Sequence, residues 1–150
     1  MRNTMTIGAS AAVLMLAGQL LAGGFFLQLG NPEASAEAQR YHAVVTIKAA
    51  GCHDPGAAQL TATAIGMVDG QRKSIPLTLT KLAEPGFFAL SQQWPTQGRW
   101  VIELKGRNGE LFTNTLVAAG PSGVDRLHAK FDMKPFVERD VTAMLEDTTR

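Results

Sequence analysis

Residues 99–119 read RWVIELKGRNGELFTNTLVAA, two runs of alternating side chains joined by Asn-Gly at positions 108–109. In the first run, Trp100, Ile102 and Leu104 point to one side, and charged side chains lie near the other. Alternation with a period of two predicts a strand with one buried face, and Asn-Gly is a strong signal for a tight hairpin turn. The stretch therefore predicts an antiparallel β-hairpin.

The same alternation recurs at short intervals through residues 41–119, and turn residues such as Asp69-Gly70 bound each run. Regular short strands without an intervening helix are typical of an antiparallel sandwich or barrel. Pro76 cannot donate to a strand ladder, so its strand should lie at a sheet edge or contain a bulge. We therefore predict an all-β, antiparallel, immunoglobulin-like β-sandwich of about seven strands, six of them at 41–48, 59–68, 74–82, 87–94, 99–105 and 110–119.

Composition narrows the class of protein. The chain has 150 residues, which suits one domain, and 45% hydrophobic against 18% charged residues, which is enough apolar material for a core. The formal net charge is +1 and no stretch gathers several Lys and Arg residues. Binding to nucleic acid is therefore disfavoured, and the absence of a GxGxxG motif or P-loop gives no support for a nucleotide cofactor.

The N-terminal segment predicts export. After Arg2 no charge occurs before Glu33, and Ala-Ser-Ala at positions 34–36 has the small-residue pattern of a cleavage site. We predict a signal peptide at residues 1–36. The alternative is an uncleaved membrane anchor, because residues 7–29 match the ~20 residues that a membrane helix needs. Both interpretations make the rest of the chain periplasmic or secreted.

The tail, residues 120–150, differs in pattern from the predicted sandwich domain at 41–119. It can hold a seventh strand near 126–131 and a short helix capped by Asp140. Because so short a helix is marginal unless it docks, we expect a tail that is poorly ordered or docked on a partner, and a sandwich that folds without residues 121–150. The apolar face of the expected helix consists of Val137, Val141, Met144 and Leu145.

Residues 84–100, EPGFFALSQQWPTQGRW, resemble the core motif of the FixH/YtkA-like group of exported immunoglobulin-like domains. The resemblance implies a seven-stranded sandwich outside the membrane, often behind one N-terminal hydrophobic segment. Members of that group include accessory proteins of membrane complexes and domains without an assigned role. The matching positions are Pro85, Gly86, Phe87 or Phe88, Ala89, Pro95, Gly98 and Trp100.

Residues 51–56, GCHDPG, contain Cys52, the only cysteine of the chain. We interpret the stretch as a connecting turn, because glycine and Asp-Pro favour turns. In that case the thiol of Cys52 is available for an intermolecular disulfide. The alternatives are a thiolate activated by His53, or a copper or zinc site that uses Cys52, His53 and His42.

Other candidate residues have simpler structural interpretations. Trp100 lies on the apolar side of its strand and should belong to the core. For Trp94 a structural role is favoured over a role in binding a ligand. His128 and Met133 could form a soft-metal pair, but a solvated surface is the simpler interpretation.

No catalytic motif such as HExxH or GxSxG occurs in the sequence. We therefore expect a non-enzymatic exported β-sandwich that acts by protein–protein interaction, as an accessory domain of the cell envelope with an envelope protein as partner. Residues 7–29 would tether it to the membrane if they are retained. The alternative is a periplasmic copper- or zinc-binding domain that uses Cys52 and His53.

Overall fold

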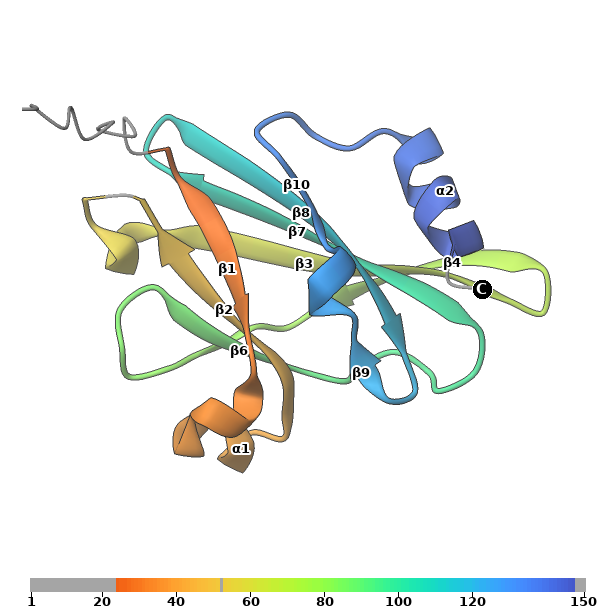
Figure 1. The fold of residues 1–150 in the computed structure, drawn as a ribbon, viewed down its shortest axis with the longest axis horizontal. Coiled ribbons are helices and arrows are strands. Elements are labelled where there is room, and N and C mark those ends of the chain that lie inside the picture. The colour runs from red at the N-terminus through yellow and green to blue at the C-terminus, as the bar shows by residue number, and fades with distance from the viewer. Residues whose placement is uncertain (1–23, 52, 148–150) are drawn as a thin grey trace, which may run out of the picture.

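The computed structural model describes residues 24–51 and 53–147, which form two facing antiparallel sheets (Figure 1). The predicted all-β sandwich is confirmed. One sheet has the order β1 (Phe26–Gly30), β2 (Ala43–Ala50), β6 (Phe87–Ser91) and β5 (Thr80–Lys81). The other has the order β10 (Lys130–Asp132), β8 (Leu111–Gly120), β7 (Arg99–Asn108), β3 (Gln59–Val68) and β4 (Gln71–Leu77), and β9 (Gly123–Val124) pairs with β8.

The strand order is that of an immunoglobulin sandwich. The sequence β1-β2-β6-β5 corresponds to strands A-B-E-D, and β8-β7-β3-β4 corresponds to G-F-C-C′. Strands β9 and β10 are additions to this plan, so the structure has more strands than the predicted seven. The helical elements are α1 (Ala36–Arg40), α2 (Glu138–Asp147) and the 3₁₀ turns η1 (Pro32–Ala34), η2 (Pro55–Ala57) and η3 (Arg126–His128).

Two tight hairpins set the register of the larger sheet. Between β3 and β4, Asp69 and Gly70 have φ values of 51° and 74°, as a type I′ turn requires. Between β7 and β8, Asn108 pairs with Leu111, so the turn residues are Gly109 and Glu110, one position later than predicted. Both predicted hairpins are confirmed.

The main core lies between the sheets. Trp100, Ile102 and Leu104 are almost completely buried, as their alternation predicted. The indole Nε1 of Trp100 donates to the carbonyl of Gln97 at 2.9 Å, and a side chain at Gly66 would overlap the Trp100 ring. These contacts make Trp100 the centre of the core. Trp94 is also buried, which agrees with its structural assignment.

The run at 74–82 does not form one strand as predicted. It divides into β4, at the edge of the six-stranded sheet, and β5, in the four-stranded sheet. At the crossover, the side-chain amide of Gln93 accepts from the backbone N–H of Thr78 and donates to its carbonyl, each at 2.9 Å. Pro76 lies in β4 and therefore on an edge strand, as expected.

The predicted start of the sandwich at residue 41 is too late. β1 pairs with β2 from Phe26 opposite Ala50 to Gly30 opposite Thr46. Phe25 and Leu27 are 4% and 1% exposed and belong to the main core. Cleavage after residue 36 would therefore remove a strand of the folded domain.

The error has a physical cause. β1 follows the apolar N-terminal stretch without an intervening charge, and only Gly23-Gly24 marks the boundary, so its alternation merges with that stretch. Residues 1–23, which hold most of the predicted signal peptide and of the possible anchor at 7–29, lie outside the described residues. Over residues 24–51 and 53–147, no helix is long and apolar enough to cross a membrane.

The tail is folded onto the sandwich, which corrects the expectation of a poorly ordered or partner-docked segment. α2 packs against β7, β8 and β3, on the side of the six-stranded sheet away from β1 and β2 (Figure 1). Val141, Met144 and Leu145 are 3–5% exposed and bury Val101 and Leu116 of that sheet. The six-stranded sheet is therefore covered on both faces over part of its area.

Details of the tail also differ from prediction. The strand predicted near 126–131 is shorter and begins later, as β10. The first part of the predicted strand, Arg126–His128, forms a 3₁₀ turn instead. Val137 precedes α2 and is 55% exposed, so it does not share the buried face. Asp140 lies inside the first turn, where its carboxylate accepts from the N–H of Val137 at 3.0 Å.

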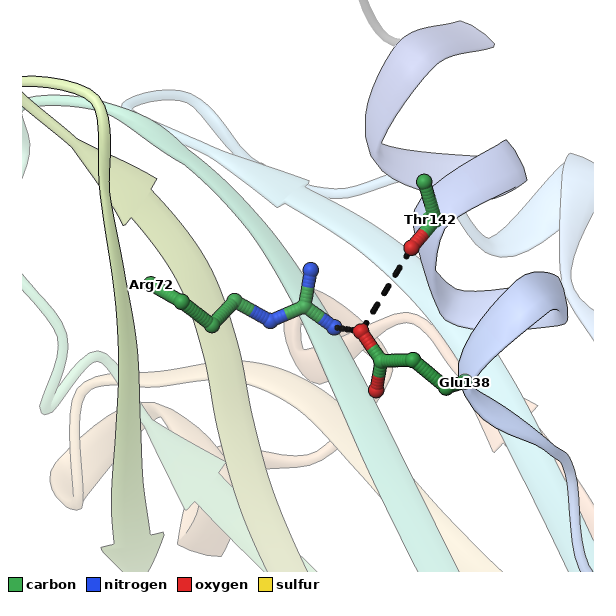
Figure 2. A network of polar contacts seen from close by, with 3 residues as sticks. All are labelled: Arg72, Glu138 and Thr142. Carbon is green, nitrogen blue, oxygen red and sulfur yellow. Dashed lines mark hydrogen bonds and ion pairs between the residues drawn. The ribbon is translucent and has the colours of Figure 1, made fainter.

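A polar network links α2 to the β3–β4 hairpin (Figure 2). Arg72 Nη2 lies 2.5 Å from Glu138 Oε1, and the Thr142 hydroxyl donates to the same oxygen at 3.5 Å. The side chains of Arg72 and Glu138 are 33% and 76% exposed. Water therefore screens this ion pair. The pair contributes more to the orientation of α2 than to the stability of the fold.

The ion pair between Arg72 and Glu138 should contribute little to the free energy of unfolding. A double-mutant cycle with Arg72→Ala and Glu138→Ala should give a coupling free energy below about 1 kcal/mol in urea unfolding. Added salt should reduce it further. A coupling of several kcal/mol would instead make this pair, and not the apolar face of α2, the main attachment of the helix.

Candidate interaction surface

The described residues include eight large apolar side chains that are exposed to solvent. Half of them come from the tail: Leu127 is 92% exposed, Met133 76%, Val137 55% and Phe131 52%. We call these four residues the tail surface. The others are Phe26, Tyr41, Leu111 and Phe112.

The backbone that carries the tail surface is held in place. β10 pairs with β8, with Phe131 opposite Thr115. The side-chain amide of Asn114 donates to the carbonyl of Met133 at 3.3 Å, and the carboxylate of Asp132 accepts from the N–H of Lys134 at 2.8 Å. The apolar side chains are thus presented from an ordered backbone, which lowers the entropy cost of binding.

A groove of about 550 Å³ lies on the outer face of the six-stranded sheet, beyond the area that α2 covers. It is formed where the loop after β10 passes over the ends of β3, β7 and β8. Three separate parts of the chain therefore meet there: the start of β3, the β7–β8 hairpin and the loop after β10. Its lining includes Gly106, Phe112, Met133, Pro135, Lys105 and Arg107.

Two cations lie at this groove, in different environments. The Arg107 guanidinium lies 5.7 Å from the centre of the Phe112 ring, and Arg107 Nε donates to the carbonyl of Gly109 at 2.9 Å. Lys105 Nζ lies 3.2 Å from a carboxylate oxygen of Glu103. Glu103 thus balances the charge of Lys105, whereas the guanidinium of Arg107 lies over the aromatic ring of Phe112.

The structure separates two of the residues proposed for the metal site. His42 directly precedes β2, and His53 follows its end. An eight-residue strand rises roughly 3.3 Å per residue, so its ends lie about 23 Å apart. His42 and His53 therefore cannot bind the same ion. Cys52 lies outside the described residues, and within those described there is no cluster of three His, Cys, Asp or Glu side chains.

The rest of the GCHDPG stretch joins β2 to β3. Gly51 has a φ of 74°, and Pro55–Ala57 forms the 3₁₀ turn η2. The side-chain amide of Asn108 donates to the carbonyl of Asp54 at 2.8 Å, and Gly86 packs directly on Pro55. These contacts connect the turn to the β7–β8 hairpin and to the corner before β6.

The soft-metal interpretation of His128 and Met133 has little geometric support. His128 Nδ1 lies 2.7 Å from a carboxylate oxygen of Asp125, and His128 borders a different hollow, with Ala118 and Met144, from the groove that Met133 lines. Met133 instead contributes to the groove and to the tail surface.

The residues that carry the family resemblance have structural roles in this fold. Gly86 and Gly98 have φ values of 75° and 85°, which favour glycine, and each lies at a corner that leads into a strand. Trp100 fills the core. Comparison with known proteins gives no match to any family model, curated protein or solved structure.

Sequence reasoning missed the groove. The sequence pattern assigns Phe112 only to a strand, and it offers Met133 as a soft-metal ligand or, more simply, as a surface residue. The available signal was an aromatic residue, Phe112, at a position that alternates with the buried Thr113 and therefore faces solvent.

Proposed function

We propose that this protein is a non-enzymatic accessory domain of the cell envelope that acts by binding an envelope protein through its tail surface. The observation that carries the proposal is the exposure of Leu127, Phe131, Met133 and Val137 on an ordered backbone. The four side chains come from one short stretch, residues 127–137, and a partner that contacts both Phe131 and Met133 would wrap the edge strand β10, because Phe131 borders a hollow beside β1 and Met133 borders the outer-face groove. Phe and Met are residue types that are enriched at the buried core of interfaces.

Export is the second part of the proposal. A stretch with the single charge of Arg2 precedes Gly24, the first described residue. Because β1 begins at Phe26, any cleavage that leaves the sandwich intact falls before it. An uncleaved segment would tether the domain to the membrane, as an anchor does.

Photo-cross-linking in intact cells tests the proposal. A photoreactive amino acid at position 127 should give a discrete adduct with one envelope protein, because Leu127 is 92% exposed on the tail surface. The matched control is the same amino acid at Leu111, which is 45% exposed at the start of β8, whereas the segment before Leu127 is bonded to Ala118 near the end of that strand. Adducts that are identical from both positions, or no adduct from position 127, would contradict the proposal.

A further inference from the structure

The groove on the outer face has the size and chemistry of a ligand site. Its volume of about 550 Å³ falls within the roughly 300–1,000 Å³ of small-molecule pockets. Phe112, Met133 and Pro135 give it apolar walls. Phe112 is 52% exposed and Met133 76% exposed, so these walls face water when the groove is empty. An apolar chain laid along them would remove that surface from water.

The charged side chains at the groove indicate the sign of the ligand. Lys105 and Arg107 are the only ionisable residues among those that line it in the described part of the chain. Glu103 neutralises Lys105, so recognition would depend on Arg107. The Arg107 Nε donates to the carbonyl of Gly109, and the guanidinium lies over the Phe112 ring, so these two contacts restrict where the guanidinium can point. A planar guanidinium held in this way suits two parallel hydrogen bonds to a carboxylate.

The geometry points to a binding site for a single-chain amphiphile with a carboxylate head group, such as a free fatty acid. The chain would lie over Phe112, Met133 and Pro135, and the carboxylate would lie at Arg107. This inference goes beyond the proposed function and does not depend on it, because Leu127 and Phe131 do not line the groove. It assigns a small-molecule ligand to a groove that shares only Met133 with the tail surface.

Displacement of a dansyl-labelled fatty acid from the full chain, below micelle-forming concentrations, tests the inference. Dodecanoate should displace the probe saturably. Decanoate, which is two methylenes shorter, should bind about fifteenfold more weakly, because each buried methylene changes affinity roughly fourfold. Dodecanol, which has the same chain but no charge, should also bind about tenfold more weakly, since it cannot form a charge-assisted pair with Arg107.

Three variants assign the effects to the groove. Arg107→Gln should remove the preference for dodecanoate over dodecanol, and Phe112→Ser should weaken both ligands about tenfold. Tyr41→Ser also removes an exposed aromatic residue but lies outside the groove, so it should change neither. Met133→Gln provides a second change in the groove wall if the Phe112 variant fails to fold.

Several results would overturn the assignment. One is equal affinity for dodecanoate and dodecanol, and another is a loss with Tyr41→Ser as large as that with Phe112→Ser. A third is that dodecanoate does not bind, whereas the protein binds lipid vesicles and Phe112→Ser abolishes that binding. The groove would then contact a lipid bilayer and would not hold a single fatty acid. Each of these results leaves the cross-link from position 127, and thus the proposed function, unaffected.

Discussion

A chain that begins at Glu37 will lose the cooperative unfolding transition that a chain beginning at Gly24 retains. The shorter chain lacks β1, and with it the buried side chains of Phe25 and Leu27. Burial of each such side chain contributes about 1.5–3 kcal/mol, which together is a large share of a total stability of ~5–15 kcal/mol. Loss of β1 also leaves the pairing edge of β2 without a partner strand. It exposes Ile47, a core residue of β2. Urea unfolding followed by circular dichroism measures the difference.

Point variants in the same strand provide the control. Leu27→Ala removes a side chain that is 1% exposed and should cost about 2–5 kcal/mol of unfolding free energy. Phe26→Ser, at the neighbouring position that is 43% exposed, should change it by no more than about 0.5 kcal/mol. If the chains from Glu37 and from Gly24 unfold at the same urea concentration, β1 is not part of the sandwich.

Removal of α2, by ending the chain at Phe136, should destabilise the sandwich by several kcal/mol. The helix buries Val141, Met144 and Leu145, and its loss would expose Val101 and Leu116, which are now 0% exposed. Truncating one buried leucine or methionine to alanine typically costs about 2–5 kcal/mol, and three such contacts are lost together. Thermal unfolding of the truncated and full chains measures the effect, and the truncated chain should also aggregate more readily because a new apolar patch is exposed.

A pair of substitutions in α2 separates packing from helix formation. Leu145→Ala should lower the free energy of unfolding by about 2–5 kcal/mol, because the side chain is 3% exposed. Arg139→Ala, at an exposed position of the same helix, should change it by no more than about 0.5 kcal/mol. Equal changes in the free energy of unfolding for the two substitutions would show that the buried face of α2 does not stabilise the protein.

The parts of the fold that could be predicted from sequence are those with local causes. Asp69-Gly70 adopts the backbone that a two-residue hairpin turn needs, and Trp100 begins a run of alternating large apolar residues, with Ile102 and Leu104, whose face lies in the main core. The docking of α2 depends on a tertiary contact. Val101 and Leu116 were the available sign, because they are apolar residues at positions that the alternation assigns to solvent.

The candidate site was less accessible to prediction. His42 and His53 are close in sequence, but β2 lies between them and separates them by its full length. The groove draws on residues near 59, 106, 112 and 134, and the pairing of β3 with β7 and of β10 with β8 brings these segments together. The exposure of Leu127 likewise depends on how the tail folds back over the sheet.

The central claim is that the segment before residue 41 and the segment after residue 120 are integral parts of one sandwich. Hydrogen exchange of the full chain tests it most directly. The account predicts that the amides of residues 26–30 that bond to β2, and the amides of residues 141–147 that bond within α2, exchange far more slowly than those of an unstructured peptide. Exchange of either segment at the rate of an unstructured peptide, while β7 stays protected, would contradict it.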